Sequence, residues 1–133
     1  MNPPSPTTRP LVLLVDDDSL LRSTITRSLQ RSGLRVLVCV DGAEAYDRLV
    51  ELGEDVDLVL SDVEMPRLSG FELRTYARAL LPDLPVLLMS GAPDLPPGAV
   101  DLRKPFAPEE LLRLVRSHIP VRATPSQASS QLG

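Results

Sequence analysis

The chain alternates short, almost wholly aliphatic runs with segments of helical periodicity, and this alternation most constrains its fold. Five runs have strand length: 11–15, 35–40, 57–61, 85–89 and 100–103. Apolar residues with helical spacing follow in four segments: 19–32, a segment that begins at Gly42, 70–81 and the segment after Pro108. In the second of these helices the expected apolar face is Ala43, Tyr46, Leu49 and Val50. Strands that are apolar on both faces are typical of parallel sheets with helices on both sides. We therefore expect an α/β fold with a doubly wound, five-stranded parallel sheet in flavodoxin-like order 2-1-3-4-5.

The crossover between the fourth and fifth expected strands departs from this pattern. Gly91–Ala99 spans nine residues and contains three prolines and two glycines. Proline inside a helix removes a backbone donor and clashes with the preceding turn, so a regular helix is not expected here. A parallel crossover usually needs about a dozen residues or more. We predict an irregular loop in place of this helix.

Both ends of the chain differ in composition from its middle. Residues 1–10 contain four prolines, and residues 120–133 are rich in serine and poor in large apolar side chains. Such segments bury too little apolar surface to offset the entropy lost on ordering, so we expect two flexible tails. Residues 11–119 are then expected to form one folded domain, with no second domain for DNA binding or kinase activity.

Charge and hydropathy exclude several classes of protein. The net charge is −4 and no basic stripe is present, which disfavours direct binding to nucleic acid. The longest apolar runs have five residues, far short of a membrane span. The single cysteine, Cys39, lies in an apolar run and is expected to be a buried thiol, whereas His118 is expected at the surface. We expect a soluble, cytoplasmic protein.

Polar side chains that can carry chemistry fall at the carboxyl ends of the expected strands. Asp16–Asp18 follow the first strand, Asp62 the third, Ser90 the fourth and Lys104 the fifth. Ligands of open α/β sheets bind at this edge, where the strand order switches direction. Because the first and third strands are adjacent in the expected order, we expect the acids, the hydroxyl and the ammonium to converge in one pocket.

The residue types in this pocket favour magnesium-dependent phosphoryl chemistry. Asp16, Asp17 and Asp62 would repel one another without a cation, and no histidine or cysteine is available nearby. Oxygen ligands favour a hard ion such as Mg²⁺, which bridges to phosphate. Lys104 would neutralise charge on a phosphoryl group, and the Ser90 hydroxyl would donate to it. A carboxylate beside the metal is a competent nucleophile, which leads to an aspartyl-phosphate.

Four motifs in this order resemble those of response-regulator receiver domains of two-component signalling. They are L-V-L-L-V-D-D-D at 11–18, D-L-V-L-S-D-V-E-M-P-R-L-S-G at 57–70, P-V-L-L-M-S-G at 85–91 and L-R-K-P-F at 102–106. The second and fourth are specific, and the resemblance covers essentially all of 11–119. It implies a signalling module, not an enzyme, that takes a phosphoryl group from a phosphohistidine of a histidine kinase or histidine phosphotransfer protein.

The resemblance also implies a role for each residue of the pocket. Asp62 resembles the phosphoacceptor, Ser90 the switch hydroxyl, and Lys104 the residue that holds the phosphoryl group and precedes a typically cis bond to Pro105. The implied Mg²⁺ ligands are Asp17, Asp62, the backbone carbonyl of Glu64 and, through water, Asp16. Kinase docking in this family uses the first helix, which makes exposed residues around Leu20 and Thr24 candidates.

Release of the phosphate is expected by self-catalysed hydrolysis. The family tunes its rate at the positions that Glu64 and Ala92 occupy in this sequence.

Two departures from the family pattern concern the readout of phosphorylation. Receivers usually carry an aromatic residue three positions before the lysine, and here that residue is Asp101. The family's fourth helix falls where this sequence has its short, proline-rich crossover. That helix belongs to the common dimer and output face, so we do not expect this face to take its usual form, and the oligomeric state stays open.

Two other functions remain as alternatives. The run Asp16-Asp17-Asp18 resembles the opening motif of haloacid-dehalogenase-type phosphatases, with Asp16 as nucleophile, but that interpretation gives Asp62 no role. A phosphorylation-independent adaptor with a receiver fold would need none of the pocket's chemistry. Each polar residue taken alone also has an ordinary interpretation as a helix cap, a turn residue or a solvated lysine.

Overall fold

Five parallel strands form the central sheet of the structure, a computed structural model that describes residues 9–119. They are β1 (Leu11–Val15), β2 (Arg35–Cys39), β3 (Leu58–Asp62), β4 (Val86–Ser90) and β5 (Leu102–Arg103). Their order is β2-β1-β3-β4-β5, and every neighbouring pair is parallel. The predicted fold class and strand order are therefore confirmed. Apart from residues 9 and 10, the two expected tails at 1–10 and 120–133 lie outside the described residues.

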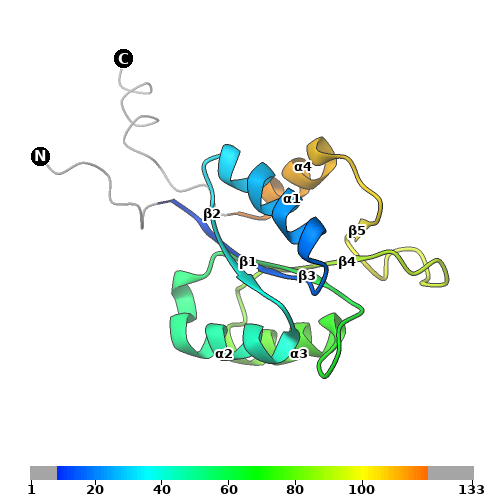
Figure 1. Ribbon diagram of the computed structural model, residues 1–133. Helices are drawn as coiled ribbons and strands as arrows, with labels where there is room; N and C mark the ends of the chain where they lie inside the picture. The colour runs from blue at the N-terminus through cyan, green and yellow to red at the C-terminus, as the bar shows by residue number, and fades with distance from the viewer. Residues whose placement is uncertain (1–8, 120–133) are drawn as a thin grey trace, which may run out of the picture.

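Helices cover both faces of this sheet (Figure 1). They are α1 (Ser19–Arg31), α2 (Gly42–Leu52), the short 3₁₀ helix η2 (Gly53–Asp55), α3 (Gly70–Leu80) and α4 (Pro108–His118). In Figure 1, α1 and α4 lie on one face, and α2 and α3 lie on the other. Side chains of a strand alternate between the two faces. Accordingly, Leu13 of β1 joins the core under α2 and α3, whereas Leu14 joins the core under α1 and α4.

Two burial patterns differ from those expected. Strands β1, β3 and β4 are buried at every position, but β2 is only partly buried, and Val38 is 45% exposed. The reason is position, because β2 is an edge strand that pairs with β1 alone. In α2, Ala45 and Leu49 are buried, whereas Ala43 and Val50 face solvent, so the expected apolar face was wrong at these two residues.

Side-chain caps begin three of the helices. The carboxylate of Asp18 accepts hydrogen bonds from the N–H groups of Leu20 and Leu21 at the start of α1. Asp41 caps α2, and Ser69 forms a reciprocal capping box with Glu72 at the start of α3. The third residue of the D-D-D run therefore serves the local structure of α1.

The crossover from β4 to β5 contains no helix among the described residues 91–101, as predicted. Side chains order it instead. The Arg103 guanidinium donates to the carbonyls of Ala92, Leu95 and Pro96 at 3.5, 2.7 and 3.0 Å. The carboxylate of Asp101 accepts the Leu88 N–H of β4 at 2.8 Å, and the Asp101 N–H donates to the Leu88 carbonyl. Charged side chains thus satisfy backbone groups that a helix or a longer strand would pair.

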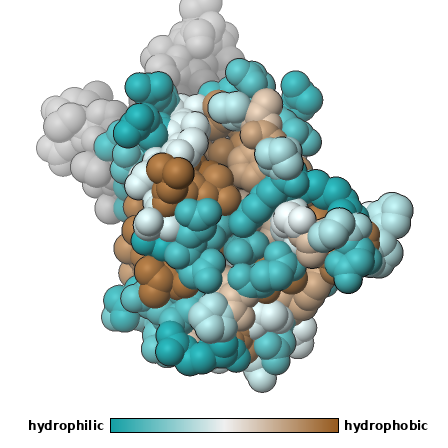
Figure 2. Space-filling view, turned by 45° about the vertical axis from the view of Figure 1, so that its right-hand side comes forward, coloured by the Kyte–Doolittle hydropathy of each residue, from teal (hydrophilic) through white to brown (hydrophobic). Residues whose placement is uncertain are grey.

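The surface drawn in Figure 2 is mainly hydrophilic, with separate apolar patches. Among the described residues, the large apolar side chains with substantial exposure are Leu20, Val38, Val40, Val50, Tyr76 and Leu80. None of the described helices combines the length and the apolar character needed to cross a membrane.

Gly70 provides a test of how tightly the end of β3 is packed. A Cβ added there would lie 2.3 Å from the carbonyl oxygen of Asp62, whereas one added at Gly91 would meet only the Lys104 side chain at 3.6 Å. We expect Gly70→Ala to lower the free energy of unfolding by about 2–3 kcal/mol, and Gly91→Ala to change it by about 0.5 kcal/mol or less. Urea unfolding measures both, and equal midpoints for the two variants would contradict this packing.

Candidate functional site

The predicted site residues meet at the carboxyl edge of the sheet. Asp16 follows β1 directly, Asp62 and Ser90 are the last residues of β3 and β4, and Lys104 follows β5. The strand register brings these ends level, because Val15 pairs with Ser61, Asp62 with Met89, and Ser90 with Arg103. A pocket of the expected composition therefore results from the strand order and register.

Three carboxylates lie together in this pocket. One oxygen from each of Asp16, Asp17 and Asp62 lies within 4.8 Å of the other two. Asp16 and Asp62 are buried, whereas Asp17 is exposed. The buried pair sits behind a carboxylate that solvent can reach, so the cluster is open on one side.

Lys104 compensates part of this negative charge. Its Nζ lies 3.1 Å from Asp16 Oδ2 and 3.2 Å from Asp62 Oδ1. The contact with Asp16 is a hydrogen bond, but the contact with Asp62 is an ion pair without hydrogen-bond alignment, and Asp62 Oδ1 is buried without a hydrogen-bond partner. Buried acceptors without a hydrogen bond are uncommon in proteins, which makes this oxygen a candidate for binding a further ligand.

The electrostatics of the pocket follow from this arrangement. Burial raises the pKa of Asp62 to about 6; Lys104 opposes this shift, and the charges of Asp16 and Glu64 add to it. Burial alone would lower the pKa of Lys104, but the charges of Asp62 and Asp16 outweigh it and hold that pKa above its usual value. Lys104 therefore stays protonated, while Asp62 titrates near pH 6.

Ser90 has partners that the sequence pattern did not indicate. Its hydroxyl donates to the Glu64 carboxylate, whose two oxygens both lie 2.8 Å from Oγ, and it accepts the Ala92 N–H at 3.0 Å. From the sequence, Glu64 was expected to offer its backbone carbonyl to Mg²⁺ and to occupy a position that tunes phosphate release, but not to contact Ser90. Glu64 lies 26 positions before Ser90, and no local motif signals a contact over that separation.

The loop that carries Glu64 is anchored on both sides. Arg67, which adopts φ 71°, forms an ion pair with Asp41, the cap of α2. The backbone N–H of Glu44 and the guanidinium of Arg67 hold the pKa of Asp41 below its usual value. At the end of the loop, the Gly70 N–H donates to the Val63 carbonyl at 2.9 Å. These contacts give the β3–α3 loop a defined position beside the pocket.

Asp101 stands where the resemblance implied an aromatic residue. Asp101 pairs with the backbone of Leu88 through both its carboxylate and its N–H, so the residue at this position binds strand β4 directly. The bond between Lys104 and Pro105 is cis, as the resemblance implied.

The comparison with known families agrees with this architecture. The profile described as response regulator receiver domain matches residues 12–116. This chain belongs to that family and is a receiver domain of two-component signalling.

Individual relatives support the same assignment. The chain is 38% identical over 128 residues to the response regulator MprA of Mycolicibacterium vanbaalenii, covering 90% of this chain and 54% of that protein. It therefore spans about half the length of the curated relatives it matches. It is also similar to a receiver domain protein from Clostridium thermocellum, with a TM-score of 0.75, 26% identity and coverage of 83% of this chain and 94% of the other. The chain is also similar to chemotaxis protein CheY4 of Vibrio cholerae, with a TM-score of 0.72, 28% identity and coverage of 84% of this chain and 99% of the other.

The raised pKa of Asp62 predicts a pH-dependent gain in stability on its replacement. The folded state binds the proton of the Asp62 carboxyl more tightly than the unfolded state. The contribution of this group to the free energy of unfolding is therefore fully present below about pH 4 and is lost as the pH rises through about 6. Without metal, Asp62→Asn should therefore raise the free energy of unfolding at pH 7.5 by about 1–2 kcal/mol, allowing for screening by water in the pocket.

Urea unfolding in chelator at pH 4 and pH 7.5 measures this gain. The exposed loop residue Asp94 supplies the matched control, because Asp94→Asn should leave the free energy of unfolding unchanged at both pH values. A gain for Asp62→Asn of the same size at both pH values, or none at pH 7.5, would show that the buried charge is not its source.

Proposed function

We propose that this receiver takes a phosphoryl group on Asp62 from the phosphohistidine of a histidine kinase or histidine phosphotransfer protein, with Mg²⁺. The observation that carries the proposal is the environment of Asp62 Oδ1, which is buried, 3.2 Å from the Lys104 ammonium and without a hydrogen-bond partner. An oxygen in this position is unsolvated and faces a group that neutralises an incoming phosphoryl. We place this exchange in the cytoplasm.

The donor set fits Mg²⁺. All three clustered side chains offer oxygen, no histidine or cysteine takes part in the cluster, and Asp62 Oδ1 accepts no hydrogen bond beside its ion pair with Lys104. In this proposal Asp17 and Asp62 bind the ion directly, Asp16 binds through water, and the backbone carbonyl of Glu64 contributes a further oxygen. When bound, the ion would neutralise charge on the carboxylates and on the phosphoryl oxygens.

The transfer step uses the residues in defined roles. A carboxylate oxygen of Asp62 attacks phosphorus, so an O–P bond forms while the N–P bond breaks and its electron pair stays on the imidazole. Lys104 holds a phosphoryl oxygen by charge, and Ser90 donates its hydroxyl proton to another as a hydrogen bond. Water later cleaves the acyl phosphate, which returns the Asp62 carboxylate and releases inorganic phosphate.

In this proposal residues 11–119 are the functional unit, and residues 1–10 and 120–133 are tails. The β4–β5 crossover has no helix among its described residues, so dimerisation through the usual face next to β5 is not expected.

Incubation with acetyl phosphate and Mg²⁺ tests the phosphoacceptor directly. We expect intact mass to increase by one phosphoryl group, the label to be stable in acid and labile in base, and chelator to abolish it. Asp62→Asn should remove the label completely, while Asp94→Asn should keep it. Phosphate turnover that requires Asp16 and survives in Asp62→Asn would support the phosphatase alternative, and no label in the native chain would support the adaptor.

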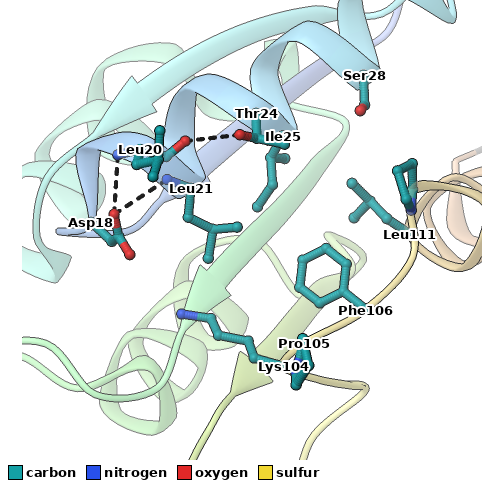
Figure 3. A pocket seen from close by; sticks show the side chains of 11 residues that line it. Asp18, Leu20, Leu21, Thr24, Ile25, Ser28, Lys104, Pro105, Phe106 and Leu111 are labelled. Atoms are coloured by element: carbon teal, nitrogen blue, oxygen red, sulfur yellow. Dashed lines mark hydrogen bonds between the residues drawn. The ribbon is translucent and has the colours of Figure 1, made fainter.

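The donor protein needs a docking surface beside Lys104. A pocket of about 460 Å³ lies there between α1, α4 and the segment after β5, lined mostly by apolar side chains (Figure 3). In Figure 3, Leu21, Phe106 and Leu111 converge from these three elements, with Lys104 at one side. Leu20, at the start of α1, is 77% exposed. We expect the helices of a phosphohistidine donor to contact this surface.

Leu20→Ala tests this docking surface. Truncation of an exposed apolar anchor should slow phosphotransfer from autophosphorylated histidine kinases of the source organism by about tenfold, without slowing labelling by acetyl phosphate. Val50→Ala is the matched control, because Val50 is 57% exposed on α2, across the sheet. Equal transfer rates for the native chain and Leu20→Ala would exclude this surface as the docking site.

A further inference from the structure

The hydroxyl of Ser90 is fully engaged in the structure. Ser90 is 1% exposed, its Oγ lies 2.8 Å from both oxygens of the Glu64 carboxylate, and the Ala92 N–H donates to Oγ at 3.0 Å. A serine hydroxyl has one proton to donate. Since a carboxylate accepts but does not donate, that proton lies between Ser90 and Glu64.

A phosphoryl group on Asp62 would compete for the same proton. Phosphoryl oxygens accept hydrogen bonds, so the Ser90 hydroxyl stabilises a phosphoryl only after it leaves Glu64. The two acceptors are both negatively charged, and the Glu64 charge is close enough to act on the Asp62 carboxyl. Bringing a phosphoryl into the pocket therefore also places two like charges near each other.

From this competition we infer that Glu64 is a positioning residue. Its carboxylate accepts the hydrogen bond of the Ser90 hydroxyl until an oxygen of the phosphoryl group replaces it as the acceptor. The inference rests on the proposed phosphorylation of Asp62. The anchored β3–α3 loop keeps the Glu64 carboxylate within hydrogen-bond distance of Ser90. Because Glu64 is exposed to solvent, its side chain is free to move outward once the hydrogen bond to Ser90 is broken.

The placement of Asp101 favours this route for the conformational change. Its carboxylate and N–H both bind the backbone of Leu88, which ties the start of β5 to β4. Asp101 thus holds two strands together. Glu64, the hydrogen-bond partner of Ser90, is the residue that must move when the Ser90 hydroxyl turns. The change at the surface then appears first at the β3–α3 loop.

The test is a double-mutant cycle on the binding of beryllofluoride, a phosphoryl mimic, at saturating Mg²⁺. Amide NMR titration gives the dissociation constant for the native chain, Glu64→Ala, Ser90→Ala and the double variant. Loss of a hydrogen bond of typical net strength predicts that Glu64→Ala binds about three- to tenfold more tightly than the native chain. In the Ser90→Ala background this gain should disappear.

A spectroscopic signature separates positioning from simple repulsion. In Glu64→Ala without beryllofluoride, the Ala92 amide resonance should move toward its position in the bound native chain, because the oxygen that it donates to is released. Glu54→Gln removes a charge from the exposed 3₁₀ helix and should change neither the affinity nor this resonance. Glu64→Gln, which keeps an acceptor but not the charge, should fall between the native chain and Glu64→Ala.

The outcomes distinguish this inference from the proposed function. If the native chain does not bind beryllofluoride, or Asp62→Asn binds it equally well, the proposed function fails and the inference fails with it. If binding depends on Asp62 but Glu64→Ala has native affinity, or its gain persists undiminished in Ser90→Ala, only the inference is overturned.

Discussion

The contact between one ammonium and two buried carboxylates is the interaction on which the rest of the site depends. Lys104 Nζ lies 3.1 Å from Asp16 and 3.2 Å from Asp62, yet a third carboxylate, Asp17, joins the cluster. One positive charge cannot balance three negative ones, and burial makes the imbalance costly. The charged pocket therefore lowers the stability of the fold, and partial protonation of Asp62 or binding of a further cation relieves that cost. Both states follow from the same excess of negative charge in the pocket.

In the proposed function, the contact between Ser90 and Glu64 would connect phosphorylation to a change of shape. Ser90 and Glu64 share one proton beside the pocket, so a phosphoryl group on Asp62 would change which group that hydroxyl donates to. The β4–β5 crossover, in contrast, is held by Asp101, which binds the backbone of β4, and by Arg103, which binds carbonyls within the crossover. A receiver without a helix at this point has less structure there to rearrange. Signalling through the β3–α3 loop is then the shorter physical route.

The sequence predicted the strand order and the meeting of Asp62 and Lys104, because aliphatic runs mark buried parallel strands and ligands bind at their carboxyl ends. It did not predict the contact between Glu64 and Ser90. That contact depends on a loop whose path is set by an ion pair between distant residues and by the close approach at Gly70. The exposure of β2 was missed for a similar reason, since an edge position is a property of the whole sheet and not of a run of residues.

The central claim is that Asp62 alone receives the phosphoryl group, and chemical trapping of the acyl phosphate tests it most directly. Borohydride reduces an aspartyl-phosphate to homoserine, which peptide mass spectrometry locates in the chain. After phosphorylation with acetyl phosphate and Mg²⁺, homoserine should appear at position 62 and at no other acidic residue of the pocket. Homoserine at position 16 or 17, or none anywhere, would contradict the claim.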